Sequence, residues 1–357
     1  MTDKESPGRC AAIIENFRKE MAKRIVGQNE MIDGLLAGLI AGGHVLLEGV
    51  PGLAKTLAVK SFAQIIGLDF KRIQFTPDLL PADLTGTLIW EQASGNFSVR
   101  RGPIFANIIL ADEINRAPAK VQSALLEAME EKQVTIGEKS YPLPNPFFVL
   151  ATENPIEHEG TYSLPEAELD RFLMKLLIVY PKPDEELEII KNTAPFSAAS
   201  VTPADKPAKN TKHDDAQQAA AQQVAAQQAP AQAPLSQVLD AEAIKLLRNT
   251  ADSIHIDEQI NKYIVSIVTA TRPVSKSTDG VYRYMSFGAS PRASIALYRC
   301  CRIYAMLEGR NFVTPEDVKN TALPVLRHRI VLSYEAEAEG MDADAVIARI
   351  LSHVPIP

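Results

Sequence analysis

The most constraining feature of this chain is one glycine-rich stretch, Glu48-Gly49-Val50-Pro51-Gly52-Leu53-Ala54-Lys55-Thr56. It follows a short apolar run, His44 to Leu47, and precedes a helical pattern from Thr56 to Ile66, so the predicted order is strand, loop, helix. A phosphate-binding loop needs this order, because backbone N–H groups of the loop and of the helix N-terminus converge on the phosphates. The stretch therefore predicts a nucleoside triphosphate site.

Two side chains of the loop carry specific chemistry. Lys55 would neutralise the β and γ phosphate oxygens, and the Thr56 hydroxyl would ligate Mg²⁺. Ala54 departs from the pattern G-x-x-x-x-G-K-[ST], because it stands where the second fixed glycine belongs and its Cβ narrows the accessible backbone conformations. The alternative interpretation is a Gly-Pro turn beside an ordinary exposed lysine. The predicted nucleotide contacts here are Gly49, Val50, Pro51, Gly52, Leu53, Ala54, Lys55, Thr56 and Leu57.

Strand and helix patterns alternate through the first half of the chain. Apolar positions at helical spacing occur from Cys10 to Met21, and Leu35, Leu36, Leu39 and Ile40 form one face of a second helix. Such alternation predicts an α/β fold, a parallel sheet with helices on both faces and chemistry at the carboxyl ends of the strands. Besides His44 to Leu47, the predicted strands are Phe70 to Phe75, Ile108 to Ala111, Phe147 to Ala151 and Met174 to Val179.

Two intervals interrupt this alternation and predict β-hairpins. In the first, Gly86 to Trp90 and Asn96 to Arg100 flank an Ala-Ser-Gly turn. In the second, Gln133 to Ile136 and Lys139 to Tyr141 flank Gly137-Glu138. Both precede a core strand, and the alternative is that they are edge decoration without a role.

Composition divides the chain into three parts. Residues 193–237 are dominated by Ala, Gln, Pro and Ser and cannot bury a core, so they are predicted to be a linker between a nucleotide-binding core, 1–192, and a second unit, 238–357. The second unit shows helical patterns without a convincing strand. Thr314-Pro315-Glu316-Asp317 is a strong helix start signal. The predicted helices are Val238 to Arg248, Asp257 to Thr271, Arg292 to Glu308, Pro315 to Thr321 and Ala343 to Ser352.

Charge and apolar content limit where the protein acts. The formal charge of -7 argues against a protein that simply coats nucleic acid. Met1 to Cys10 lacks the apolar core of a signal peptide, and the most apolar stretch, Gly34 to Gly43, is too short to span a bilayer, so we expect a soluble cytoplasmic protein without membrane insertion. The three cysteines lack zinc or redox spacing and are predicted to be buried free thiols.

An acidic pair follows one of the predicted buried strands. Ile108 to Ala111 delivers Asp112 and Glu113 to its carboxyl end, where Asp112 would hold the Mg²⁺ shell and Glu113 would polarise the attacking water. Without the upstream loop, an acidic pair here would be an ordinary loop start. Asn154, at the end of the next strand, would orient the same water or the γ-phosphate, although Asn before Pro155 is also a common turn.

Two arginines complete the predicted site. Arg171 lies just before the last strand, where its guanidinium would reach a γ-phosphate bound by a neighbouring subunit. Arg292 begins a helix in the second unit and would close over the phosphates of its own subunit's ATP. A surface salt bridge is the alternative for each.

Taken together, these motifs resemble the MoxR family of AAA+ ATPases over most of the chain. The residues that carry the resemblance are Glu48 to Thr56, Ala111 to Ala117, Ala151 to Pro155, Leu164 to Ala167 with Arg171-Phe172, and Gly288 to Ala293. Family members often carry alanine at the position of Ala54. The 193–237 tract departs from the family pattern and leaves the tightness of the coupling between core and second unit open.

The resemblance implies a fold and a set of roles. It implies sheet order 5-1-4-3-2, a helical lid from about Leu239, and a homo-oligomer, a hexameric ring with ATP between subunits. It assigns Walker A to Lys55 and Thr56, Walker B to Asp112 and Glu113, sensor 1 to Asn154, the arginine finger to Arg171 and sensor 2 to Arg292. The adenine would lie against Val26, Gly27 and Gln28, and the hairpins would face the pore or a client.

The predicted function is that of a chaperone-like ATPase that remodels or matures partner proteins, with ATP and Mg²⁺ as cofactors. By resemblance, the partners would be proteins with von Willebrand factor A domains or enzymes that need maturation. One alternative is a helicase-like nucleic-acid motor, which the mixed charges Arg100, Arg101, Lys132 and Lys139 with Glu131 and Glu138 disfavour. Another is a nucleotide-gated scaffold without turnover, which the intact Glu113 and Arg171 disfavour.

Overall fold

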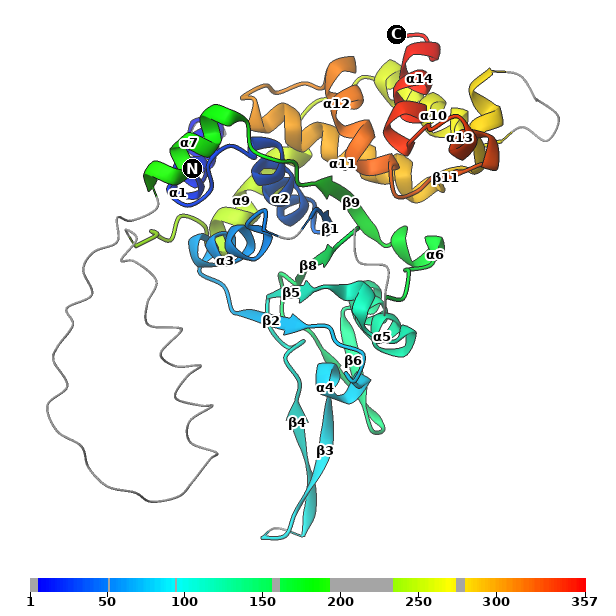
Figure 1. The fold of residues 1–357 in the computed structure, drawn as a ribbon. Coiled ribbons are helices and arrows are strands. Elements are labelled where there is room, and N and C mark those ends of the chain that lie inside the picture. Colours follow the sequence, from blue (N-terminus) through cyan, green and yellow to red (C-terminus); the bar gives the residue numbers. More distant parts are fainter. Residues whose placement is uncertain (1–5, 51, 94, 156–160, 193–233, 274–279) are drawn as a thin grey trace, which may run out of the picture.

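A five-stranded parallel sheet forms the centre of the N-terminal part (Figure 1). The structure is a computed structural model and describes residues 6–50, 52–93, 95–155, 161–192, 234–273 and 280–357. Strand order is β2-β5-β8-β1-β9, which is order 5-1-4-3-2 when the hairpin strands are not counted, and it confirms the predicted α/β sheet. The core strands are β1 (His44–Glu48), β2 (Phe70–Gln74), β5 (Ile108–Asp112), β8 (Phe148–Glu153) and β9 (Phe172–Leu177).

Helices cover both faces of the sheet because the strand side chains alternate between two apolar clusters. From β5, Ile108 and Leu110 pack in the cluster that contains Phe62, whereas Ile109 and Ala111 pack in the one that contains Leu125. The first cluster is formed with α1 (Ser6–Ala22), α2 (Asn29–Ala41) and α3 (Lys55–Ile66), and the second with α4 (Pro81–Thr85) and α5 (Ala119–Glu131).

The last strand of the sheet differs most from its predicted bounds. We expected the last strand from Met174 to Val179, but β9 begins at Phe172 and ends at Leu177. Its start is set by pairing with β1, since Phe172 lies opposite His44. Val179 and Tyr180 therefore lie beyond the sheet, where their side chains are exposed.

Both predicted hairpins are confirmed. The first, β3 (Gly86–Glu91) with β4 (Asn96–Arg101), extends well away from the body of the molecule (Figure 1). The second is β6 (Gln133–Ile136) with β7 (Lys139–Pro142). The shorter elements of this part are η1 (Ile114–Arg116), α6 (Glu166–Leu169) and α7 (Pro183–Asn192).

The second unit is a helical lid with one addition to the prediction. Among the described residues we expected no strand here, but β10 (Met285–Phe287) pairs antiparallel with β11 (Val331–Leu332), a ladder too short to show any sequence periodicity. The Thr314 signal is confirmed as a capping box with Asp317. The other elements are α9 (Ala241–Ser253), α10 (Glu258–Ala270), η2 (Gly280–Tyr284), α11 (Pro291–Leu307), α12 (Pro315–Leu326), α13 (Tyr334–Ala338) and α14 (Ala343–His353).

Core and lid share one apolar cluster. Phe17 of α1 and Leu35 of α2 belong to the same buried cluster as Leu247 of α9 and Leu297 of α11. At the entry to the lid, Leu239 is buried and its backbone N–H donates to the carbonyl of Ile65. The lid is thus packed on the core, although most of the predicted linker, residues 193–233, lies outside the described residues.

Two further sequence predictions concern cysteines and membranes. Cys10, Cys300 and Cys301 are all buried free thiols, as expected. Of the helices in the described ranges, none combines the length and the apolar character needed to cross a bilayer.

Candidate functional site

The loop between β1 and α3, the predicted phosphate loop, contains left-handed backbone at two positions. Gly52 adopts φ +88°, and Ala54 adopts φ +56°, both in the left-handed region. Ala54 therefore takes the conformation that a glycine would take at this position. Its Cβ makes this left-handed conformation less favourable than it would be for glycine. Pro51 lies outside the described residues. Of the other predicted contacts, Gly49 is buried, Val50, Leu53, Lys55 and Thr56 are half-buried, and Gly52, Ala54 and Leu57 are exposed.

Lys55 joins the carboxyl ends of two core strands. Its Nζ donates to the carbonyl of Gly49 (2.5 Å), just after β1, and to the carbonyl of Glu153 (3.1 Å), at the end of β8. Asn154 follows Glu153 directly and is buried, 4% exposed. Burial raises the pKa of the Glu153 carboxyl, with Lys175 opposing the rise. The structure thus brings Lys55 and the segment that carries Asn154 to one edge of the sheet.

Asp112 is held between two threonines at the same edge. Its Oδ1 accepts from the hydroxyl of Thr152 (2.6 Å), and its Oδ2 accepts from the hydroxyl of Thr56 (3.4 Å). Carboxylate and hydroxyl oxygens are the hard donors that Mg²⁺ prefers, and Mg²⁺ sites in nucleotide enzymes use one or two protein oxygens plus phosphates. One carboxylate and one hydroxyl, from Asp112 and Thr56, are therefore a donor set that fits Mg²⁺ bound together with the phosphates of a nucleotide.

Glu113 follows Asp112 in a strained conformation. Its φ of +57° places a non-glycine residue in the left-handed region, a feature that concentrates at functional sites. Its N–H donates to Thr152 Oγ1 (2.9 Å), so one threonine positions both acidic residues. The Glu113 carboxylate accepts from Gln74 Nε2 (2.8 Å) and pairs with Arg116 (3.1 Å).

The predicted adenine segment lies between α1 and α2. Val26 is half-buried, and Gly27 (φ +67°) and Gln28 (φ +55°) both adopt left-handed backbone. Gln28 Nε2 donates to the carbonyl of Val179 (2.7 Å). A Cβ on Gly27 would lie 2.6 Å from the carboxyl carbon of Glu185, and the left-handed φ would strain any other residue there. The segment thus packs against the chain between β9 and α7.

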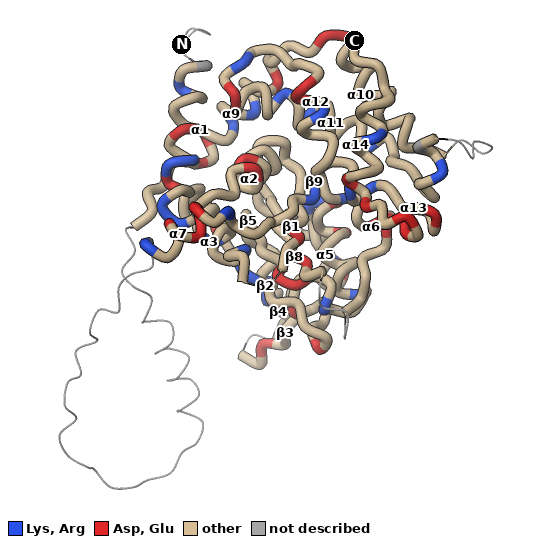
Figure 2. The backbone as a smooth tube through the Cα atoms, turned by 45° about the horizontal axis from the view of Figure 1, so that its top comes forward, with Lys and Arg blue, Asp and Glu red and all other residues tan. Residues whose placement is uncertain are grey.

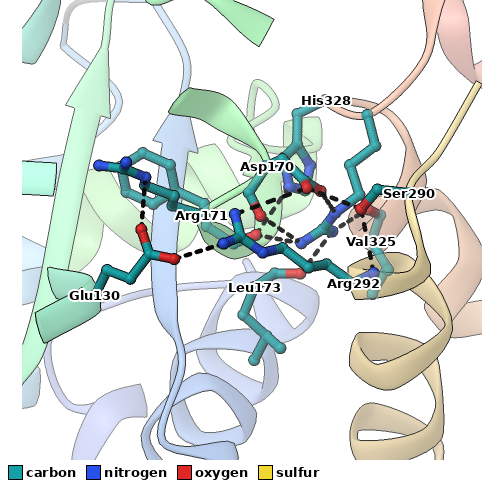
Figure 3. Close-up of polar contacts among 10 residues, drawn as sticks. Glu130, Asp170, Arg171, Leu173, Ser290, Arg292, Val325 and His328 are labelled. Atoms are coloured by element: carbon teal, nitrogen blue, oxygen red, sulfur yellow. Dashed lines mark hydrogen bonds and ion pairs between the residues drawn. The ribbon is translucent and has the colours of Figure 1, made fainter. Parts of the chain in front are cut away.

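Arg171 and Arg292 converge on one carboxylate. Arg171 Nε lies 3.1 Å from Oε2 of Glu130, and Arg292 Nη2 lies 2.5 Å from Oε1 of the same residue. The carboxylate of Glu130, from the end of α5, lies between the two guanidinium groups (Figure 3). Next to them, Asp170 accepts from the hydroxyl of Ser290 (2.8 Å).

The arginine pair lies at the amino ends of the parallel strands, whereas the phosphate loop lies at their carboxyl ends. A cleft of about 230 Å³ is lined by both arginines together with Gly43 and His44, which precede and begin β1. The two ends of β1 are roughly 13 Å apart, and Lys55 lies beyond the far end. In this structure the lid places Arg292 beside Arg171 rather than at the phosphate loop of its own subunit.

Comparison with known proteins identifies the family. The model of the ATPase family associated with various cellular activities (AAA) matches residues 44–174, and the AAA lid domain model matches residues 281–350. The chaperone MoxR1 of Mycobacterium tuberculosis is 44% identical over 339 residues, which cover 95% of this chain and 81% of that protein. The chain belongs to the MoxR family of AAA+ ATPases.

Other relatives agree with this assignment. The protein YeaC of Bacillus subtilis is 42% identical to the MoxR-family chain over 333 residues, 93% of this chain and 91% of YeaC. A crystal structure from Cytophaga hutchinsonii, described as a candidate ATPase, superposes with a TM-score of 0.81 at 44% identity and covers 99% of this chain and 98% of that one.

Sequence reasoning about this MoxR-family chain missed the residues that surround the acidic pair and the arginines. Arg72 and Gln74 of β2 reach Asp112 and Glu113, and their spacing of two on the strand next to β5 was the available signal. Thr152 lies two residues before Asn154 in the motif Ala151 to Pro155, but its contacts with Asp112 and Glu113 were not predicted. Glu130 gave no signal, because a glutamate on a helix surface is ordinary.

Proposed function

We propose that this MoxR-family protein hydrolyses ATP at Mg²⁺-dependent sites shared between neighbouring subunits of a ring. The observation that carries the proposal is the pairing of Arg171 and Arg292 on Glu130, at the edge of the sheet away from the phosphate loop. Two cations at a cleft there lie far from the chain's own phosphate loop, and their position suits the phosphates of an adjacent copy. A hexamer is the ring that the family resemblance favours.

Six of the predicted residues then have roles at one of two edges of the sheet. At the phosphate-loop edge, Lys55 would bind the β and γ phosphates, Thr56 and Asp112 would hold Mg²⁺, and Glu113 would take the proton of the attacking water. Mg²⁺ would neutralise charge that develops on the phosphates. At the other edge, Arg171 and Arg292 would stabilise the γ-phosphate of the neighbouring subunit. The neighbour's phosphates would replace Glu130 as the partner of both arginines.

We further propose that hydrolysis drives remodelling of partner proteins. The β3–β4 hairpin extends from the body and exposes Trp90 (51%) and Phe97 (65%), whose rings pack edge to face 5.0 Å apart. An exposed aromatic pair on a projecting hairpin is a surface for protein contact. Basic and acidic residues are interspersed over core and lid (Figure 2), which disfavours a nucleic-acid motor. Proteins with von Willebrand factor A domains are the partner class implied by the resemblance.

Mixed rings test the shared site. Arg171→Ala and Glu113→Gln should each abolish turnover alone, but in mixtures a site is complete where a Glu113-bearing subunit meets an Arg171-bearing neighbour. We expect activity to return on mixing. If the mixtures stay as inactive as their parents while both variants demonstrably co-assemble, the shared-site proposal fails. Turnover that DNA stimulates many-fold would instead favour the nucleic-acid motor.

A further inference from the structure

Arg72 binds the carboxylate that is predicted to hold the metal. Its Nε (3.0 Å) and Nη2 (2.7 Å) both donate to Oδ2 of Asp112. This is the oxygen that also accepts from the Thr56 hydroxyl, whereas Oδ1 is taken by Thr152. The guanidinium therefore sits on the one Asp112 oxygen that faces Thr56, the other proposed metal ligand.

The exposure of the two partners differs in a way that suits a replaceable cation. The Asp112 side chain is 9% exposed, so its charge needs a partner inside the protein. The Arg72 side chain is 42% exposed and comes from β2, the outermost strand of the sheet on that side. It can swing into solvent without opening the core.

The ion pair is not needed to hold the two strands together. Residues Phe70 to Gln74 of β2 already pair in register with Ile108 to Asp112 of β5. A structural role would thus add little to a complete backbone ladder. Nη2 also donates to Oε1 of Gln74 on the same strand (2.7 Å), so the contact that Arg72 makes with β5 is the one with Oδ2 of Asp112.

We propose that Arg72 is a resident counter-cation for Asp112 that competes with Mg²⁺ and so sets the magnesium concentration at which nucleotide binds tightly. Oδ2 already accepts three donors, and a guanidinium and a divalent ion at one oxygen repel each other strongly. Arg72 must therefore leave Oδ2 when a divalent ion binds between Thr56 and Asp112. The inference rests on the proposed function, because it needs a Mg²⁺-nucleotide site at these residues.

The test is a magnesium titration of nucleotide binding, without turnover. Fluorescent mant-ADP at fixed concentration is titrated with MgCl₂ in the wild type and in Arg72→Gln, and the Mg²⁺ concentration at half-maximal change is compared. Losing a half-exposed ion pair as competitor should lower that midpoint about fivefold. Binding of mant-ADP in excess EDTA should stay within about twofold of wild type.

Two further variants make the result specific. Lys71→Gln removes the same charge from the adjacent exposed position of β2. If the shift in the magnesium midpoint comes from the Arg72–Asp112 contact and not from the overall positive charge of β2, this variant should keep the wild-type midpoint. Arg72→Lys keeps a cation near Asp112 and should move the midpoint less than Arg72→Gln does. It also covers the case in which the glutamine variant does not fold.

The outcomes separate this inference from the proposed function. If all proteins bind mant-ADP with the same magnesium midpoint, Arg72 does not compete and the inference is wrong, while the shared Mg²⁺-nucleotide site stands. A midpoint shifted equally by Lys71→Gln would also overturn it. If the wild type shows no magnesium-dependent binding at all, the proposed function itself fails.

Discussion

Arg329 of the lid donates through Nε to the carboxylate of Asp170 (2.8 Å), the residue that precedes Arg171. The Arg329 side chain is only 3% exposed, and burial lowers its pKa against the opposing effect of Asp170. Its other N–H groups donate to backbone carbonyls, namely those of Asp170, Phe172, Leu173 and Val325. The lid therefore fixes the segment that carries Arg171, so lid position and the predicted finger are coupled.

Asp170→Asn tests this coupling. The amide keeps the shape but leaves the buried guanidinium without its counter-charge, which should lower the free energy of unfolding by about 2 kcal/mol, discounted for the partial exposure of Asp170. ATP turnover should fall as well, because the Arg171 segment loses its anchor. Urea denaturation and steady-state turnover measure the two effects.

An exposed ion pair provides the control. Glu15→Gln removes one carboxylate from the Glu15–Lys19 ion pair on α1, whose side chains are 67% and 65% exposed, and should leave stability and turnover unchanged. Unchanged unfolding in Asp170→Asn would show that the backbone acceptors alone satisfy Arg329.

The features of this fold that could be predicted from the sequence are those determined by residues close to one another in the chain. The phosphate loop, the buried strands and the capping box at Thr314 each depend on residues within a few positions of one another. The sheet order came from family resemblance and could not have come from periodicity. The observed bounds of β9 lie two residues before the predicted ones, because the start of this strand depends on pairing with His44, far away in sequence.

The parts that it missed depend on contacts between distant elements. Arg292 was assigned to its own subunit's phosphates, but the packing of α11 on α2 and β9 places it beside Glu130. Arg72 is an exposed arginine on an edge strand, where a surface role is the ordinary expectation. Only the register of β2 against β5 brings it to Asp112.

Glu113→Gln and Lys55→Ala separate binding from hydrolysis. Glu113→Gln should bind ATP but hardly turn it over, because the amide keeps the shape and loses the base. Lys55→Ala should lose ATP affinity, because it removes the charge that offsets the β and γ phosphates. Filter binding and phosphate release measure the two. Wild-type turnover in Glu113→Gln, or wild-type affinity in Lys55→Ala, would contradict the corresponding role.

His44 should make the protein sensitive to mild acid. Val149 N–H donates to its Nδ1 (3.0 Å), so Nε2 carries the proton and donates to Met129 O (3.2 Å). Burial lowers the pKa of His44 from 6.5 to about 4. Below pH 6.5 the unfolded chain binds a proton at this histidine, whereas the folded chain does not. The free energy of unfolding therefore decreases as the pH is lowered, by up to about 1.4 kcal/mol per pH unit.

His44→Asn tests this titration, since its amide oxygen can still accept from Val149. Stability is measured by urea denaturation between pH 7.5 and 5, above the range where most carboxylates titrate. The variant should be less stable at pH 7.5 but show a shallower fall below pH 6.5. His328, whose pKa burial also lowers, leaves a residual slope of the same sign. Equal slopes in both proteins would exclude His44 as the source.

Mixed rings of Arg171→Ala and Arg292→Ala decide whether the two arginines serve the same site. They contact the same carboxylate here, so we expect both to act on one neighbour's nucleotide. Every site in the mixture then receives one arginine and lacks the other, and turnover should stay at the level of the parents. If Arg292 acted on its own subunit, an Arg171→Ala subunit beside an Arg292→Ala neighbour would hold both groups, and activity would return as in mixtures with Glu113→Gln. Recovery would thus show that the lid moves Arg292 away from Glu130 to the opposite edge during turnover.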